Sequence, residues 1–189
     1  MKLNSDNRWY ALRIRPRFEK LAATHLRDKG YEEYLPLFKS RRRWSDRTKV
    51  VELPLFPGYA FCRFDVRNRL PVLVAPGVLS IVGVGKIPAS IPEAEICSIQ
   101  KAVASGLHCE PWSSVPIGHR VSVKRGPLEG LSGTLIEVKS NFRLILSLPL
   151  LQRSVAVEID GDCVETSSWQ PADRSGETRN SARTAGSSL

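Results

Sequence analysis

The sequence predicts an α+β domain followed by a small β-barrel and a polar tail. Strand-like runs and amphipathic helical segments alternate over residues 1–106, whereas short strand-like runs punctuated by glycine fill residues 117–168. A segment containing proline and serine, residues 107–116, separates the two and is expected to be a linker. Residues 169–189 are polar and lack an apolar period, so we expect them to be disordered.

The amino-terminal elements are delimited by turn and capping residues. Gly30 suits the end of a first helix that starts near a proline, and Ser90 with Glu93 forms a capping-box pattern. Asp65 could cap a short helix with a kink or a restart at Pro71. The apolar spacing between these positions predicts an antiparallel sheet with helices packed against it. We expect strands over residues 9–15, 31–38, 48–53, 59–64 and 78–82, and helices over residues 16–30, 66–74 and 90–106.

The carboxy-terminal domain is predicted to contain strands only. Pro127 and Pro149 would each destabilise a helix drawn through this region by about 3 kcal/mol, and glycine at positions 126, 130 and 133 permits tight turns. We therefore expect a permanent barrel, tethered loosely to the first domain. Its strands are predicted over residues 120–124, 133–139, 142–148 and 154–159.

Charge and cysteine content narrow the classes of function. Lys and Arg outnumber Asp and Glu by 19 to 10 over residues 1–105, but are matched 9 to 9 over residues 106–189. A basic first domain favours contact with phosphate backbones, and such contact would be salt-dependent. The four cysteines lie far apart without a Cys-x-x-Cys pair, so neither a metal site nor a disulfide framework is predicted. No apolar run is long enough for a membrane span, and we expect a cytoplasmic monomer.

The densest basic cluster lies between two predicted strands. Arg41, Arg42 and Arg43 precede Trp44, and Arg47 follows it. Such a hairpin tip can bind nucleic acid through its cations, or it can be a solvated surface only. The sequence leaves both interpretations open.

Three motifs resemble the NusG family of transcription factors. Trp9-Tyr10 comes first, Leu55-Phe56-Pro57-Gly58-Tyr59 follows, and Gly118-x-x-Val121-x-Val123-x-x-Gly126-Pro127-Leu128-x-Gly130-x-x-Gly133 comes last. In that family the amino-terminal domain, called NGN, is an α+β sandwich, and the carboxy-terminal domain is an SH3-like barrel called KOW. The resemblance implies a transcription elongation or antitermination factor that needs no cofactor or metal.

The resemblance also implies a surface for RNA polymerase. NusG-like proteins bind the clamp helices of the β' subunit in an apolar depression of the NGN domain. By motif, Phe56 and Tyr59 would line that depression, with Trp9 and Tyr10 beside or beneath it. An aromatic pair held by a Pro-Gly turn is the kind of anchor that dominates an interface.

The basic cluster and the length of the chain resemble the specialised paralogues of the UpxY, LoaP and RfaH kind. These proteins also contact the non-template DNA strand or the nascent RNA. By position, Arg15, Arg17 and His25 become candidates for such contacts, together with the arginines of the hairpin tip.

The KOW part resembles modules that bind a NusE-like ribosomal protein or Rho. The matching positions are Leu131, Leu150, Leu151 and Arg153, which we expect to be free on the barrel. An alternative function is that of a KOW-containing RNA-binding or ribosome-associated protein without polymerase binding. An enzyme is not expected, because the sequence contains no nucleophile motif, no phosphate-binding loop and no metal-ligand spacing.

Overall fold

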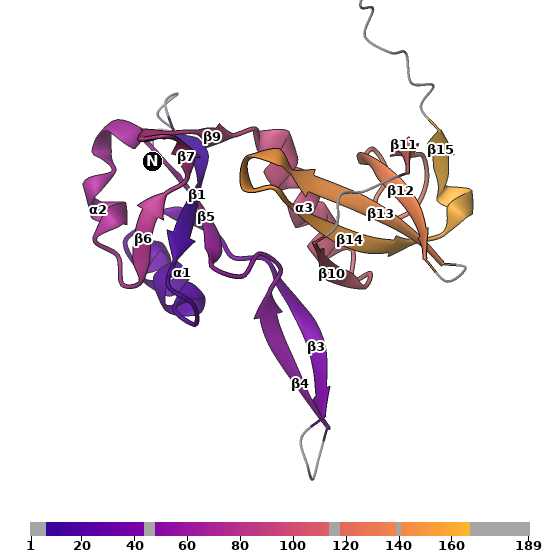
Figure 1. Cartoon of the computed structure of the whole chain (residues 1–189), viewed down its shortest axis with the longest axis horizontal. Coiled ribbons are helices and arrows are strands. Elements are labelled where there is room, and N and C mark those ends of the chain that lie inside the picture. The colour runs from indigo at the N-terminus through magenta and orange to yellow at the C-terminus, as the bar shows by residue number, and fades with distance from the viewer. Residues whose placement is uncertain (1–6, 44–47, 114–117, 139–140, 167–189) are drawn as a thin grey trace, which may run out of the picture.

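The computed structural model describes residues 7–43, 48–113, 118–138 and 141–166. An amino-terminal α+β domain lies beside a carboxy-terminal domain of strands, and helix α3 lies between them (Figure 1). This is the predicted fold class. The predicted disorder of residues 169–189 concerns a segment outside the described residues.

The amino-terminal domain is built on an antiparallel sheet with strand order β2-β5-β1-β6, to which β9 adds by pairing with β1. Side chains of the central strand alternate between two covered faces, so almost every residue of β1 is buried. The strands are β1 (Arg8–Ile14), β2 (Glu32–Tyr34), β5 (Tyr59–Phe64), β6 (Val78–Ile81) and β9 (Ser90–Ile91).

Helices cover both faces of this sheet. Helix α1 (Glu19–Asp28) and the short helix α2 (Leu70–Leu73) pack against the face that carries Tyr10, Leu12 and Phe64. Helix α3 (Glu93–Ala104) packs through Ile96 and Ile99 against the face that carries Trp9 and Phe61. The two faces therefore belong to two different apolar clusters.

Two predicted helix starts are wrong and one predicted cap is confirmed. Helix α1 begins at Glu19 rather than at the proline, because Arg17 adopts a left-handed conformation with φ of 72°. Helix α3 begins at Glu93 with Pro92 at the cap position, since Ser90 is part of strand β9. The Asp65 side chain accepts a hydrogen bond from the Arg67 backbone N–H at 2.9 Å and caps the 3₁₀ helix η1 (Val66–Asn68), as expected.

The predicted strand over residues 31–38 is two strands. Proline at position 36 interrupts it, and the chain leaves the sheet after β2 to enter β3 (Leu37–Arg43). Strand β3 pairs with β4 (Thr48–Pro54) in a hairpin that projects from the body of the domain (Figure 1). A second, short hairpin joins β7 (Gly83–Val84) to β8 (Ile87–Pro88).

The carboxy-terminal domain is a six-stranded antiparallel sheet curved into the expected small barrel, with strand order β10-β14-β13-β12-β11-β15. Leu144, Leu146, Val155 and Val157 fill its interior. The strands are β10 (Cys109–Trp112), β11 (His119–Val123), β12 (Ser132–Val138), β13 (Asn141–Leu148), β14 (Arg153–Ile159) and β15 (Val164–Thr166). Two 3₁₀ turns complete it, η2 (Pro149–Leu151) and η3 (Gly161–Cys163).

Part of the expected linker is a strand of the barrel. Within residues 107–116, β10 pairs along its whole length with β14, from Cys109 opposite Val157 to Trp112 opposite Ser154. Pro111 suggested a linker, but β10 is an outer strand of the sheet, where a residue without a backbone N–H is tolerated. Residues 114–116 lie outside the described part of the chain.

The two domains share one apolar cluster, and this overturns the expected loose tether. The cluster runs from Trp9 and Phe56 in the first domain through Ile99 of α3 to Leu146 and Leu151 in the barrel. The Lys101 side chain of α3 also donates a hydrogen bond to the backbone carbonyl of Glu129 in the barrel. The surface around Phe56 is therefore not left open in this arrangement.

Candidate functional site

The turn between β4 and β5 positions the two aromatic residues of the predicted polymerase surface. Gly58 adopts a φ of 81°, which a residue with a side chain rarely does, and its carbonyl accepts a hydrogen bond from the Ile14 N–H at 2.8 Å. The Gly58 N–H donates to Oε1 of Glu19 at 3.0 Å, and the Tyr59 N–H donates to the Phe56 carbonyl at 3.0 Å. The turn is thus fixed to both β1 and α1.

Phe56 and Tyr59 differ in exposure, although both follow from the same motif. Phe56 is only 1% exposed and packs edge-on against Phe61, with ring centroids 5.5 Å apart. Tyr59 is half-buried and lies at the margin of the same cluster. The expectation that both rings are accessible is wrong for Phe56, because the cluster that encloses it continues into α3 and the barrel.

Trp9 and Tyr10 lie on opposite faces of the sheet. Trp9 is 3% exposed and belongs to the cluster of Phe56. Tyr10 packs beneath α1 and α2 against Phe64, with ring centroids 4.9 Å apart. Of the two aromatic residues expected beside or beneath the depression, Trp9 therefore lies on the side of Tyr59 and Tyr10 lies on the opposite side of the sheet.

Arg13 is a residue of this face that the sequence analysis missed. It stands directly opposite Tyr59 in the pairing of β1 with β5, and opposite Ser80 in the pairing of β1 with β6. Opposite residues of an antiparallel pair point to the same side, so Arg13 shares the face of Tyr59. Its side chain is exposed. The sequence could have indicated this position, because every second residue of a strand lies on the same face and Arg13 follows Trp9 and Ala11 at that spacing.

The predicted nucleic-acid residues fall into separate groups. Arg15 and Arg17 lie in the turn before α1, where the Arg15 guanidinium stands 5.5 Å from the centre of the Phe18 ring. His25 is half-buried in the last turn of α1. A helix of this length spans about 15 Å, so His25 lies at the end of α1 away from both arginines.

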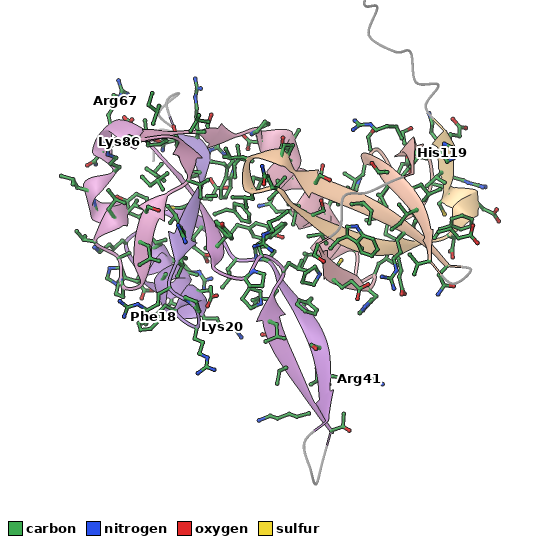
Figure 2. All side chains as sticks on the ribbon, in the orientation of Figure 1. Phe18, Lys20, Arg41, Arg67, Lys86 and His119 are labelled. Atoms are coloured by element: carbon green, nitrogen blue, oxygen red, sulfur yellow. The ribbon has the colours of Figure 1, made fainter. Side chains whose placement is uncertain are left out.

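The basic hairpin carries its cations along β3. Arg41 is exposed and stands opposite Val50, which is also exposed. The backbones of Arg42 and Arg43 pair with β4, and their side chains lie outside the described part of the chain. The Lys20 Nζ of α1 lies 3.4 Å from Oε2 of Glu52 on β4, which links α1 to this hairpin. Figure 2 shows Phe18, Lys20 and Arg41 along one side of the molecule.

The predicted contact residues of the barrel are partly covered. Leu131 and Leu151 are each 8% exposed and belong to the cluster that the two domains share. Leu150 is half-buried, whereas Arg153 is exposed at the start of β14. The expectation that these positions are free on the barrel is therefore wrong for Leu131 and Leu151.

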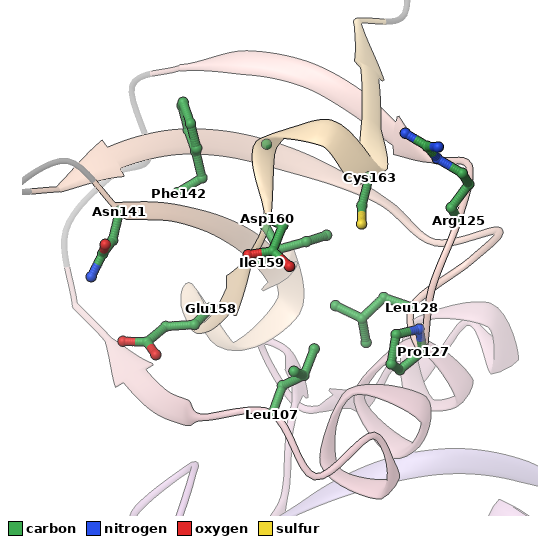
Figure 3. Close-up of a pocket in the computed structure, with 11 residues that line it drawn as sticks. Leu107, Arg125, Pro127, Leu128, Asn141, Phe142, Glu158, Ile159, Asp160 and Cys163 are labelled. Atoms are coloured by element: carbon green, nitrogen blue, oxygen red, sulfur yellow. The ribbon is translucent and has the colours of Figure 1, made fainter.

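The barrel also contains a pocket of about 370 Å³, and none of the predicted contact residues lines it (Figure 3). Leu107, Leu128 and Ile159 give it an apolar lining, and Arg125 and Asp160 are among its charged lining residues. Arg125 is engaged within the barrel, since its Nη2 donates to the backbone carbonyl of Asp162 at 2.6 Å.

The four cysteines form no disulfide bond with one another. All four are free, and among the described residues no three His, Cys, Asp or Glu side chains are placed to hold a metal ion. Burial, with the nearby Glu33 and Glu32 carboxylates, raises the pKa of Cys62 to about 12, and burial raises the pKa of Cys109 to about 11. Both thiols therefore stay protonated at neutral pH. No helix in the described part of the chain is long and apolar enough to cross a membrane.

The structure thus has two modules, and a partly covered aromatic face lies on the more basic α+β domain. The model of the NusG family, described as transcription termination factor nusG, matches residues 7–100. The transcription termination/antitermination protein NusG of Helicobacter pylori strain J99 is 27% identical over 166 residues, covering 80% of this chain and 93% of that protein. The NusG of Thermus thermophilus is 26% identical over 156 residues, covering 75% of this chain and 84% of that protein.

A solved structure described as domain interaction in Thermotoga maritima NusG has the same fold. It aligns with a TM-score of 0.53 at 19% identity, over 85% of this chain and 97% of that one. The chain belongs to the NusG family of transcription termination/antitermination factors. This is a family of transcription factors, not of enzymes.

Proposed function

We propose that this protein is a transcription elongation factor that binds the β' clamp helices of RNA polymerase and promotes processive elongation or antitermination. The observation that carries the proposal is the fixed Phe56–Tyr59 turn. Its hydrogen bonds to Ile14 and Glu19 hold Tyr59 on the uncovered part of the sheet face. A rigid aromatic anchor loses little conformational entropy when a partner helix packs on it.

Binding of this kind acts on the polymerase by shifting its equilibrium from paused states toward the state with a closed clamp. A factor that contacts both sides of the cleft stabilises the closed clamp relative to paused states, and no covalent bond changes. The shift can be no larger than the difference in affinity for the two states. The cytoplasm, where the polymerase works, is the proposed location.

The closed arrangement of the domains adds a condition to the proposal. Phe56 on the first domain and Leu131 and Leu151 on the barrel lie in one buried cluster. A polymerase helix could reach Phe56, and a ribosomal protein or Rho could reach these leucines, only after the domains separate. Tyr59 and Arg153 are accessible before separation.

We further propose that the factor is a specialised one that acts on particular operons and touches nucleic acid. Arg15 and Arg17 in the turn before α1 and Arg41 on the hairpin are exposed cations on the more basic domain. Arg42 and Arg43 extend the same strand. The half-buried His25, at the other end of α1, is the least accessible member of this set. Non-template DNA and nascent RNA both offer the phosphates that such side chains bind.

A pull-down with the full chain as bait tests the function. We expect RNA polymerase core enzyme to be retained at moderate salt by the wild type and lost from the Tyr59→Ala variant. Retention of ribosomal proteins or RNA without polymerase would instead establish the alternative, an RNA-binding or ribosome-associated protein.

A further inference from the structure

On the face of the sheet that carries Tyr59, Arg13 lacks a carboxylate partner among the described residues, at the place where a partner is proposed to bind. Arg13 is exposed, and among the described residues no acidic side chain pairs with it. Arg63, which lies on the same face opposite Trp9, is held by Glu32 at 3.5 Å and by Glu93 at 3.2 Å.

Two cations of helix α1 are also paired with carboxylates. Arg27 is paired with Glu33, and Lys20 with Glu52. On the face of Tyr59, Arg13 thus differs from Arg63 in having no carboxylate partner among the described residues. An unpaired arginine on a surface costs little while water solvates it, but it gains a charge-assisted, two-pronged interaction when a carboxylate is brought to it.

The surroundings of Arg13 favour a protein partner over nucleic acid. The half-buried Tyr59 stands opposite it on β5, and Ser80 stands opposite it on β6. Leu79, where the register of β6 shifts, is 54% exposed. An aromatic ring beside a single unpaired cation forms a mixed surface, whereas a phosphate-binding surface gathers several unpaired cations.

We propose that Arg13 is a specificity-determining residue of this surface, and that it pairs with an Asp or Glu on the helix that packs on Tyr59. This inference rests on the proposed function, since the helix would belong to the polymerase clamp. The apolar contact would supply affinity, while the ion pair would fix the register of the helix and exclude helices that lack the carboxylate.

The test measures the affinity of the full chain for RNA polymerase core enzyme by biolayer interferometry at several salt concentrations. Arg13→Gln should weaken binding about tenfold or more, as expected for loss of a charge-assisted hydrogen bond, and should flatten the salt dependence. Arg13→Lys keeps the positive charge but loses the planar guanidinium, so its affinity should lie between that of the wild type and that of Arg13→Gln. Arg8→Gln is the matched control, because Arg8 is an exposed arginine of the same strand on the opposite face. It should bind within about twofold of the wild type.

Charge reversal gives the sharper result. Arg13→Glu should bind polymerase more weakly than Arg13→Gln. A polymerase in which the partner carboxylate on the clamp helices is replaced by Lys should bind Arg13→Glu again, but should not bind wild-type protein better. Thermal melting should show unchanged stability for every Arg13 variant, since the side chain is exposed.

Three outcomes would overturn the inference. If Tyr59→Ala loses polymerase while Arg13→Gln binds like the wild type, the surface is correct and the ion pair is not. If Arg13→Gln keeps polymerase affinity but loses single-stranded DNA or RNA, Arg13 is a phosphate contact. If neither Tyr59→Ala nor Arg13→Gln changes polymerase binding, the proposed surface itself fails.

Discussion

The Glu19 carboxylate accepts a hydrogen bond from the backbone N–H of Gly58 at 3.0 Å, which joins the first turn of α1 to the turn before β5. Glu19 is one of the few charged residues of the described chain that are buried, at 7% exposure. A carboxylate in such a place serves to satisfy a backbone donor that would otherwise lose its hydrogen bond. The position of Tyr59 therefore depends on a residue in a different element.

Replacing Glu19 with alanine should lower the free energy of unfolding by about 1–3 kcal/mol, because the Gly58 N–H loses its acceptor. Glu19→Gln keeps a carbonyl oxygen and should cost less. Urea denaturation followed by fluorescence measures both. Glu52→Gln is the control, since it removes only an exposed ion pair and should change stability by less than about 1 kcal/mol. Equal stability of the alanine variant and the wild type would contradict the proposed role.

Phe56→Ala and Tyr59→Ala should separate stability from binding. Phe56 is buried, so its truncation should cost about 3–5 kcal/mol of folding free energy. Tyr59 is half-buried, so its truncation should affect stability less but weaken polymerase binding by about 2 kcal/mol. Denaturation and binding assays on the same samples would show the contrast. If Tyr59→Ala unfolds the protein while Phe56→Ala does not, the burial assigned to the two rings is wrong.

Strand β10 should make a measurable contribution to the barrel. A fragment of residues 107–166 retains the pairing of Cys109–Trp112 with β14, whereas a fragment of residues 115–166 leaves that edge of β14 unpaired. Both should give β-type circular dichroism, and the longer one should melt at a higher temperature. Identical melting temperatures would mean that residues 109–112 act as a tether after all.

Arg17→Gly should increase stability while weakening nucleic-acid contact. At φ of 72° a side chain costs about 1–2 kcal/mol, and glycine removes that cost but adds entropy to the unfolded chain. A net gain of about 0.5–1 kcal/mol is expected in thermal or urea denaturation. Crosslinking to single-stranded DNA or RNA should fall at the same time. A loss of stability would contradict the strain assigned to the Arg17 backbone. Unchanged crosslinking would contradict a nucleic-acid contact of the Arg17 side chain.

Changing Arg41, Arg42 and Arg43 together to serine should reduce nucleic-acid contact in the elongation complex and flatten its salt dependence. Each lost phosphate contact removes about one released counterion. Polymerase affinity measured without nucleic acid should change little, because the hairpin projects from the body of the amino-terminal domain (Figure 1). If crosslinking and the salt slope are both unchanged, the hairpin tip is a solvated surface only.

The sequence predicted the caps and turns that depend on neighbouring residues. It did not predict the features that depend on pairing with residues far away in sequence. The cap at Asp65, the restart at Pro71 and the Pro57-Gly58 turn are local, and the structure contains all three. The capping box at Ser90 failed because that residue pairs with Tyr10 of a strand far away in sequence.

The candidate site shows the same division. The motif identified Phe56 and Tyr59, but their unequal burial arises from the packing of α3 and the barrel, which local spacing does not encode. Arg13 was missed because its role depends on its register opposite Tyr59.

The apolar cluster that passes through α3 also bears on how the protein loses its structure. Residues that belong to one continuous interior melt together, so a substitution in α3 such as Ile99→Ala would weaken both domains at once. A protein in this arrangement would show one heat-absorption peak in calorimetry. A protein whose domains have been parted by a partner would show two, and the number of transitions would then report which arrangement is present.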